Sequence, residues 1–299
     1  MVDVPETPAR RLRLPRFGLG DLWAEADWIQ RIAALLAILL AASALLAPWI
    51  APFDPTDQSL LSRLRPPIGF ERFKDGYWLG TDELGRDMLS RGLYGLRLTL
   101  MLAMLGACIG LAVGSILGLL AGVLGGIADS LVMALVDVQI AVPFTLIALL
   151  VVAIFGAEVE VLVVVLGIYG WEQYARIVRG EVLKLREMPF VEAARATGAS
   201  PARIALVHIL PNVTSPLVVQ FTLSFSNIVL LESTLSFLGL GVQPPTATLG
   251  SMVGIGRDYM PSAPWIVMVP AIAILLVTFA VQILGDWLRD RADVRLRGR

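Results

Sequence analysis

Six long apolar segments constrain the fold of this chain more than any other feature of its sequence. They lie at about residues 32–50, 98–123, 131–155, 161–174, 216–238 and 264–284. A helix needs roughly 20 apolar residues to cross about 30 Å of hydrocarbon. Several of the segments approach or exceed that length, and the fourth is short at its polar end. The pattern predicts an all-α membrane protein with six transmembrane helices.

Composition supports this class of protein. Hydrophobic residues make up 57% of the 299 residues and charged residues only 16%, far from the balance of an ordinary soluble domain. The formal net charge of -1 argues against a nucleic-acid partner, because phosphate binding needs a concentrated basic surface. The single cysteine, Cys108, lies inside an apolar segment, so no disulfide can form within the chain.

Basic residues predict the orientation, because arginine and lysine are enriched in cytoplasmic loops. They gather before the first segment, between the fourth and fifth, and after the sixth, and six crossings place these regions on one side. We therefore expect both termini to be cytoplasmic. The residues are Arg10, Arg11, Arg13, Arg16, Arg176, Arg179, Lys184, Arg186, Arg195, Arg203, Arg289, Arg291, Arg295, Arg297 and Arg299.

This orientation divides the chain into five parts. Residues 1–28 form a cytoplasmic tail, 29–51 an anchor helix, 52–94 an extracytoplasmic loop, 95–288 the membrane core and 289–299 a second cytoplasmic tail. The anchor could instead be a secretory signal. Against this, its apolar part is long, and the small-x-small triplet Ala42-Ser43-Ala44 lies inside that part, not after it.

The core contains a polar loop at residues 176–215 whose chemistry predicts two short helices with a sharp joint. Pro189 suits a first helical position, and Gly198 can end that helix in a left-handed conformation. Ser200 is a good N-cap for a second helix that begins at Pro201. We expect Pro211 to end the second helix. Such a compact polar unit between two spans would present a rigid surface to a soluble partner.

The same loop resembles the coupling loop of bacterial ABC-importer permeases. That pattern reads Glu-Ala-Ala, three residues, Gly, nine residues, then Ile-x-Leu-Pro. The matching positions are Glu192, Ala193, Ala194, Gly198, Leu210 and Pro211, and His208 stands at the isoleucine position.

Three further stretches, at residues 80–87, 235–245 and 284–290, resemble the C-type subunit of the dipeptide/oligopeptide permeases. The resemblance covers about residues 30–297. In one departure, Leu249 stands where that subfamily is expected to have tryptophan.

The resemblance implies a type I permease core of five helices preceded by the anchor helix, in a bacterial cytoplasmic (inner) membrane. It implies a second homologous permease as heterodimer partner, two ATP-binding cassette ATPases that bind the ATP, and an extracytoplasmic substrate-binding protein. The loop at residues 189–211 would couple this chain to the ATPases. The binding protein would dock near residues 80–87 and 243–245. No cofactor is expected on this chain.

Five glycines lie four residues apart in the second segment and form one slowly turning helix face. Such a groove allows another backbone to approach closely, either within the chain or at a subunit interface. The glycines are Gly106, Gly110, Gly114, Gly118 and Gly122.

Ionisable residues inside apolar segments indicate pairing or a function, because their burial in lipid is costly. Glu232, in the fifth segment, either pairs with another helix or faces a wet pathway, where it would contact the amino group of a passing peptide. Asp137 is expected to bond a neighbouring helix or loop, and Pro143 to kink the third segment. His208 is expected to pack or cap rather than to switch its charge.

Motifs for chemistry are absent from the sequence. It has one histidine and one cysteine, no nucleophile elbow, and only two lysines, neither in a phosphate loop. The expected function is therefore that of a transport subunit and not of an enzyme. An ion-coupled secondary carrier is the alternative from another class, although no inverted halves are visible. Within the ABC family, nickel chelates or glutathione are alternative cargoes to di- and oligopeptides.

Overall fold

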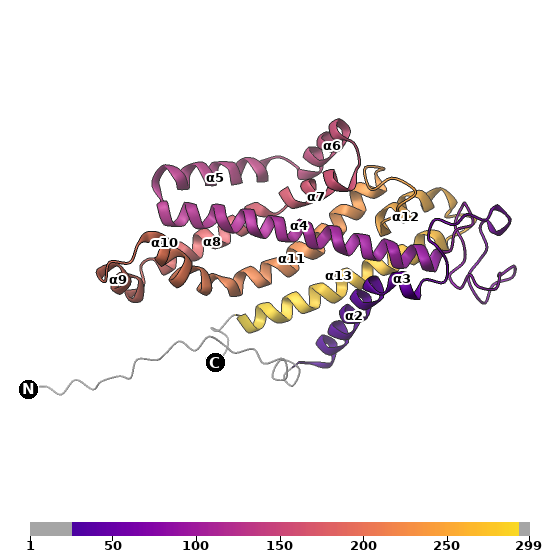
Figure 1. Ribbon diagram of the computed structural model, residues 1–299, viewed down its shortest axis with the longest axis horizontal. Coiled ribbons are helices and arrows are strands. Elements are labelled where there is room, and N and C mark those ends of the chain that lie inside the picture. The colour runs from indigo at the N-terminus through magenta and orange to yellow at the C-terminus, as the bar shows by residue number, and fades with distance from the viewer. Residues whose placement is uncertain (1–25, 293–299) are drawn as a thin grey trace, which may run out of the picture.

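The computed structural model describes residues 26–292, and every named element in that range is helical (Figure 1). The elements are α2 (Trp28–Leu45), α3 (Ala47–Ile50), η1 (Leu60–Ser62), α4 (Met88–Leu124), α5 (Gly126–Ala141), α6 (Phe144–Phe155), α7 (Val159–Ile168), α8 (Trp171–Leu185), α9 (Pro189–Ala196), α10 (Pro201–Arg203), η2 (Ile204–Ile209), α11 (Leu210–Phe237), α12 (Leu249–Gly256), η3 (Arg257–Tyr259) and α13 (Trp265–Ala292).

The predicted tails lie mostly outside the described residues, and with them Arg10, Arg11, Arg13, Arg16, Arg295, Arg297 and Arg299.

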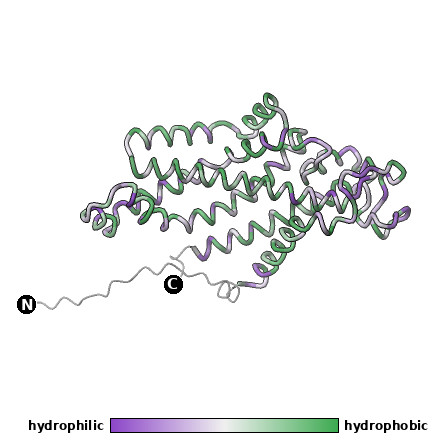
Figure 2. The backbone as a smooth tube through the Cα atoms, viewed as in Figure 1, coloured by the Kyte–Doolittle hydropathy of each residue, from purple (hydrophilic) through white to green (hydrophobic). Residues whose placement is uncertain are grey.

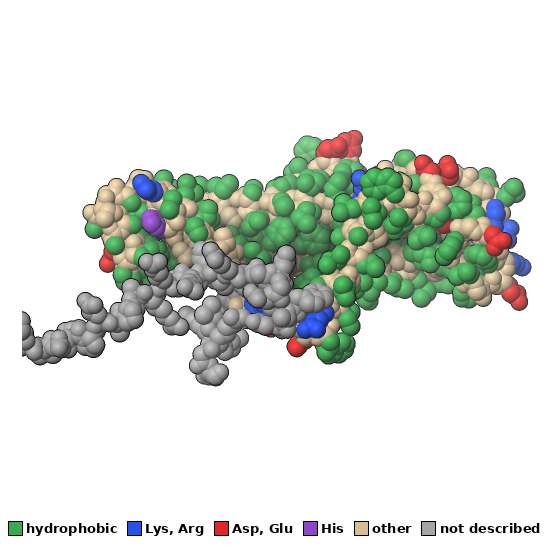
Figure 3. All heavy atoms as spheres, turned by 60° about the horizontal axis from the view of Figure 1, so that its bottom comes forward, with side chains coloured by type: hydrophobic (Ala, Val, Ile, Leu, Met, Phe, Trp, Pro, Cys, Tyr) green, Lys and Arg blue, Asp and Glu red, His purple; other side chains and the backbone are tan. Residues whose placement is uncertain are grey.

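The long helices α4, α11 and α13 run lengthwise through an elongated bundle (Figure 1). The bundle carries α9 and α10 at one end and the loop before α4 at the other. Hydrophobic residues dominate the helices between these ends, and hydrophilic residues concentrate in the two end regions (Figure 2). Hydrophobic side chains also cover most of the described surface seen in Figure 3. This distribution suits a helix bundle that spans a lipid bilayer.

Five helical segments are long and apolar enough to cross a membrane, and a bent pair of helices makes a sixth if it is counted as one span. The five are Trp28–Leu45, Met88–Leu124, Val159–Leu185, Pro201–Phe237 and Trp265–Arg291. The prediction of an all-α membrane protein is confirmed, with the sixth span supplied by the bent pair.

The bent pair is the predicted third span, in which α5 and α6 meet at 86°. The α5 helix ends at Ala141, and Pro143 stands at the N-cap of α6. A proline disfavours helical geometry in the residue before it, so Val142 is extended and the helix breaks there. The predicted kink is confirmed, and it is a full break.

Two predicted boundaries differ from the structure because helices continue beyond the apolar residues. The α4 helix begins at Met88, not near 95, since Asp87 caps it and its first turn is bonded to the preceding loop. The α8 helix continues to Leu185, so residues 176–185 belong to a helix and not to the polar loop. One face of α8 stays apolar at helical spacing, which a count of apolar residues along the sequence overlooks.

The predicted end of the second loop helix at Pro211 is wrong. The chain runs from Pro201 through the π-helical η2 into α11 as one helical segment that ends at Phe237. The wider π turn leaves room for the Pro211 ring, which would meet a carbonyl group in a regular helix. Asn212 Nδ2 donates to the His208 carbonyl oxygen at 2.6 Å and so satisfies an acceptor at the same place.

The glycine face of α4 packs against α7 and α8 within the chain. A Cβ atom added to Gly106 would lie 3.0 Å from the Leu166 Cβ, and one added to Gly118 would lie 2.5 Å from the Ala175 carbonyl oxygen. Gly110, Gly114 and Gly122 likewise face the α7–α8 segment, at Tyr169, Trp171 and Val182. The glycines therefore allow close contact between two backbones along most of the span.

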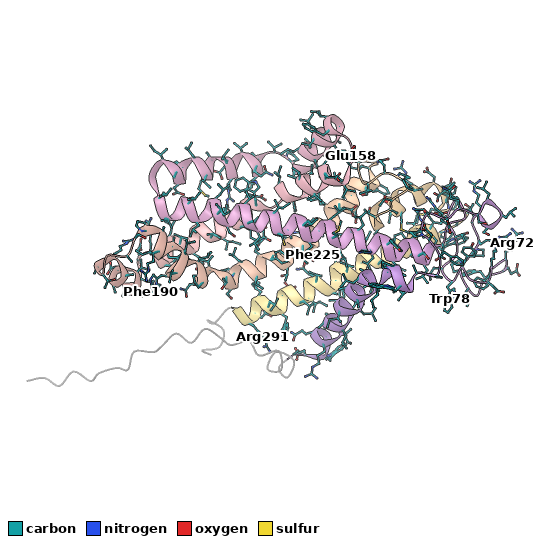
Figure 4. All side chains as sticks on the ribbon, viewed as in Figure 1. Arg72, Trp78, Glu158, Phe190, Phe225 and Arg291 are labelled. Atoms are coloured by element: carbon teal, nitrogen blue, oxygen red, sulfur yellow. The ribbon has the colours of Figure 1, made fainter. Side chains whose placement is uncertain are left out.

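The largest buried cluster lies where α4, α7 and α11 meet, and it includes Leu102, Leu166 and Phe225 (Figure 4). A second cluster, with Val182, Val191 and Ile204, fixes α9 against the ends of α8 and α11. These two clusters position the candidate sites described below.

Candidate coupling site and membrane pathway

The coupling turn, residues 186–200, contains α9 and lies at one end of the bundle, where Phe190 is labelled in Figure 4. Pro189 is the first residue of α9, as predicted. Gly198 has φ +83° and donates its amide to the Arg195 carbonyl, while Ala199 donates to the Ala194 carbonyl. This pair of hydrogen bonds is a Schellman motif, which a residue with a left-handed conformation closes. The predicted end of the first helix is confirmed.

The second half of the joint is also as predicted. Ser200 is the N-cap, and its side chain accepts a hydrogen bond from the Arg203 amide at 3.3 Å. On the inner face of α9, Val191 is fully buried in the cluster with Val182 and Ile204, and Ala194 packs against that cluster. The coupling turn is therefore held from inside by apolar contacts and, where α9 meets α10, by two caps.

The outer face of the coupling turn is exposed. Glu192 and Ala193 are open to solvent, as are Arg195 and Arg203. Within the described part of the chain, no salt bridge forms to any of these three charged residues. Of the predicted coupling residues, Glu192, Ala193 and Gly198 thus share an accessible surface, while Pro211 lies within the continuous helical segment.

A cavity of about 220 Å³ lies behind the coupling turn. It is bounded by the ends of α4 and α8 on one side and by residues 195–209 on the other. Its lining is Gly122, Val123, Val182, Arg186, Arg195, Ala199, Pro201, Ile204 and Ile209. The cavity leaves space into which the coupling turn can be pressed.

Glu232 lies in α11 and is only 1% exposed. Its Oε1 atom accepts a hydrogen bond from Ser236 Oγ at 2.6 Å, and Ser236 Oγ lies 3.4 Å from Thr248 Oγ1 at the start of α12. Thr99 of α4 accepts from the Leu249 amide nearby. In this conformation Glu232 sits inside a hydroxyl cluster where three helices meet, and it does not face an open passage.

Asp137 pairs with a neighbouring helix, as predicted: its Oδ1 atom lies 2.7 Å from Arg176 Nη2 of α8. Both side chains are more than half exposed. Nearer the start of α5, Asp129 pairs with Arg179, so two ion pairs join α5 to α8.

Residues 80–87 form a buried charged knot at the opposite end, close to the part of the loop where Figure 4 labels Trp78 and Arg72. Asp82 is 2% exposed, and its Oδ2 atom lies 2.6 Å from Arg86 Nε and 3.2 Å from Arg91 Nε. Its Oδ1 atom accepts from the Leu84 and Arg86 amides at 2.9 Å. Asp87 caps α4 through the Ser90 amide.

The same knot is joined to the rest of the molecule. Trp265 Nε1 of α13 donates to the Thr81 carbonyl oxygen at 3.0 Å. Gly85 has φ +75°, and a Cβ atom there would overlap the Ser59 carbonyl oxygen. The charged side chains of residues 80–87 therefore bond within the chain.

From the sequence, no functional role is predicted for the polar residues at the break between α7 and α8. Gly170 is left-handed, with φ +83°, and Glu172 and Gln173 follow it. Gln220 Nε2 of α11 donates to Gln173 Oε1 at 2.5 Å and to Ser224 Oγ at 3.1 Å. The signal in the sequence is a glycine followed by Glu and Gln at the end of an apolar segment that is too short to span, together with a glutamine inside the next one.

A long helical bundle with a rigid exposed turn at one end and a folded loop at the other is the architecture of an integral-membrane transport subunit. The comparisons support this class. The model of the binding-protein-dependent transport system inner membrane component family matches residues 114–296.

Relatives match over nearly the whole chain. The di/tripeptide transport system permease protein DppC of Pseudomonas aeruginosa (strain UCBPP-PA14) is 42% identical over 263 residues, which cover 88% of this chain and 87% of that protein. The dipeptide transport system permease protein DppC of Escherichia coli (strain K12) is 40% identical over 302 residues, covering 99% and 100%. The chain belongs to the family of binding-protein-dependent transport system inner membrane components.

The fold also matches a solved structure. A chain from an inward-facing crystal form of the MetNI methionine ABC transporter aligns with a TM-score of 0.52 and 23% identity, over 69% of this chain and 97% of that chain. At this identity the match supports the fold alone. It agrees with the predicted permease core.

Proposed function

We propose that this chain is one of two permease subunits of an ATP-binding-cassette importer of dipeptides and short oligopeptides. Membership of the family makes it a binding-protein-dependent membrane component. The cargo rests on relatives that are named as dipeptide and di/tripeptide permeases, at 36% to 42% identity over at least 87% of their length. A second, homologous permease would complete the passage, and two ATPases would bind the ATP.

The observation that carries the coupling role is the exposed, capped coupling turn. Glu192, Ala193, Ala194 and Gly198 belong to a unit whose inner side is buried and whose outer charges have no ion-pair partner within residues 26–292. A cytoplasmic ATPase that binds Glu192 would press on the cavity behind it. Because residues 201–237 form one helical segment that leaves the turn, displacement of the turn would tilt the pathway helix α11.

This proposal sets the orientation. The coupling turn would be cytoplasmic, together with both termini, and residues 52–87 would be extracytoplasmic, where the binding protein docks. The parts are then a tail at 1–28, an anchor at 29–51, an outer loop at 52–94, a core at 95–288 and a tail at 289–299. The α4 glycines would serve as helix packing, and Glu232 would reach a peptide only if α12 moves away from α11.

The test is reconstitution of the complete importer with its binding protein, with uptake of radiolabelled dialanine and ATP hydrolysis measured together. Gly198→Pro should remove uptake, because proline cannot adopt the positive φ of this position. Lys184→Ala, in an exposed pair on α8, is the control and should leave uptake unchanged. Purification without an associated ATPase, or normal uptake by Gly198→Pro, would refute the proposal.

An ion-coupled carrier and an ABC importer differ in the energy source that drives uptake. Uptake by an ion-coupled carrier would survive loss of ATP in vesicles and would stop when an uncoupler removes the ion gradient. An ABC importer would stop on ATP depletion and tolerate the uncoupler. Competition by unlabelled glutathione or a nickel chelate against dialanine in the same vesicles would decide among the cargoes.

A further inference from the structure

The break between α7 and α8 lies at half the depth of the membrane span. Gly110 is at the middle of the apolar segment 98–123 of α4. A Cβ atom there would lie 3.2 Å from the Tyr169 carbonyl oxygen and 3.8 Å from the Trp171 amide nitrogen. The residues that follow Gly170 are therefore at the level where lipid is driest and where an unpaired polar group costs most.

Four polar side chains form a group that we call the polar strip: Gln173 and Arg176 of α8, and Gln220 and Asn227 of α11. The strip runs along the bundle past this level, because Ala175, next to Arg176, faces Gly118 of α4. Gln173 and Arg176 are neighbours on one face of α8, and Gln220 and Asn227 share one face of α11, seven residues apart. The Gln220–Gln173 hydrogen bond joins the two faces. Gln173, Arg176 and Asn227 are exposed.

The polar strip is unsuited to contact with lipid. Glutamine, asparagine and arginine within a membrane span face the interior of an assembly or water. The side chains of the Arg176–Asp137 ion pair are 51% and 69% exposed, which suits contact with water. By contrast, exposed residues of α4 on the apolar surface include Ile116 and Leu120.

Glu172 adds an unsatisfied acceptor beside the polar strip. It is 8% exposed, and its Oε2 atom is buried with no hydrogen-bond partner among the described residues. Arg176, one turn further along α8, donates a hydrogen bond to Asp137 instead. A buried carboxylate oxygen without a partner is destabilising, so a chain that retains one at mid-depth has an acceptor available for a ligand.

We propose that the polar strip lines the translocation pathway and that Glu172 accepts the N-terminal ammonium group of a peptide in transit. This inference deepens the proposed function and depends on it for the identity of the cargo. An ammonium group donates up to three hydrogen bonds, which suits a carboxylate, because a carboxylate only accepts them.

The first experiment tests whether water reaches the polar strip, independently of cargo. In the complete importer with Cys108→Ala, single Gln173→Cys and Ile116→Cys variants are treated with a charged, membrane-impermeant thiol reagent. We expect Gln173→Cys to react at least about tenfold faster than Ile116→Cys, because a thiolate forms only where water has access. Equal and slow reaction at both positions would show a dry surface, such as a subunit interface, and would overturn the pathway assignment.

The second experiment tests Glu172 as the acceptor. Glu172→Gln keeps the shape of the side chain and removes the charge, and it should lower dialanine uptake by about tenfold while ATP hydrolysis stimulated by the binding protein persists. Glu172→Asp should retain more uptake than Glu172→Gln. A purely structural glutamate would give normal uptake, with unchanged or raised thermal stability, in Glu172→Gln, and that result would overturn the assignment.

The two proposals fail in different ways. If the wild-type importer takes up no peptide, the proposed cargo is wrong, whereas rapid labelling of Gln173→Cys would still support a pathway. If the wild type takes up dialanine and the Gln173→Cys and Glu172→Gln results are both negative, the importer is correct and this pathway assignment is wrong.

Discussion

The charged residues at the two ends of the bundle differ in burial and in ion pairing. At the end formed by the loop before α4, Asp82, Arg86 and Arg91 are at most 4% exposed and form ion pairs with one another. At the other end, Glu192 and Arg195 are exposed, and neither forms a salt bridge within the described residues. The charges of the first group are paired inside the chain, whereas those of the second group are accessible to a partner protein.

Because of this difference, substitutions at one end should affect stability and substitutions at the other end should affect coupling. A buried ion pair that loses one member leaves an uncompensated charge and costs several kcal/mol. An exposed charge without a partner contributes little to folding and is available for intermolecular recognition. The charged knot at residues 80–87 should therefore be sensitive to substitution in stability, and the coupling turn in transport.

Asp82→Ala should have the largest effect on stability. It would leave Arg86 and Arg91 buried with one carboxylate fewer and the Leu84 amide without its acceptor, so we expect a loss of about 3–5 kcal/mol. Thermal unfolding of the purified importer, followed by loss of soluble protein, measures it. The matched control is Asp57→Ala, an exposed acid of the same loop, and similar melting of both variants would contradict the view of the knot as structural.

Two glycines with a similar backbone give the next comparison. Gly85 and Gly198 have φ of +75° and +83°, but a Cβ atom at Gly85 would overlap the Ser59 carbonyl oxygen, whereas the space around Gly198 is open. Gly198→Ala should cost only about 1 kcal/mol, for the backbone alone. Gly85→Ala should cost more, because the chain at Ser59 must also move. Equal melting temperatures would show that the outer loop adapts freely.

Glu192→Ala should have the smallest effect on stability, within about 0.5 kcal/mol, because the side chain is exposed and forms no salt bridge in the described region. Its effect on transport should be large. We expect uptake to fall while the melting temperature stays constant, as measured in the reconstituted importer. A drop in melting temperature as large as that of Asp82→Ala would remove the distinction between the two ends.

Local chemistry predicts the coupling turn well because its determinants are neighbours in sequence. Pro189, Gly198 and Ser200 each act on the backbone within a few residues, and the structure has all three in the expected positions. Pro211 follows the same kind of rule, yet the helix continues through it. The π turn before it depends on packing of Ile204 and Ile209 against α8 and α9, which lies outside local reasoning.

The membrane core shows a second limit. Apolar segments identify the spans and the kink at Pro143, but the fourth apolar segment ends near residue 174 in the sequence, where polar residues begin. These residues continue as α8, whose apolar face packs against the α4 glycines. Glu172 and Gln173 therefore look like the edge of a loop in the sequence and lie at mid-depth in the structure. Only the pairing of α8 with α4 reveals their level.

The unbroken helical segment from Pro201 to Phe237 has a mechanical consequence. Its 37 residues form a lever arm that begins beside the coupling turn and ends close to α12. At 1.5 Å per residue the arm is ~55 Å long, so a tilt of about 5° gives a stroke of roughly 5 Å at the far end. A small displacement at Ser200 would thus be carried directly to the end of the segment beside α12.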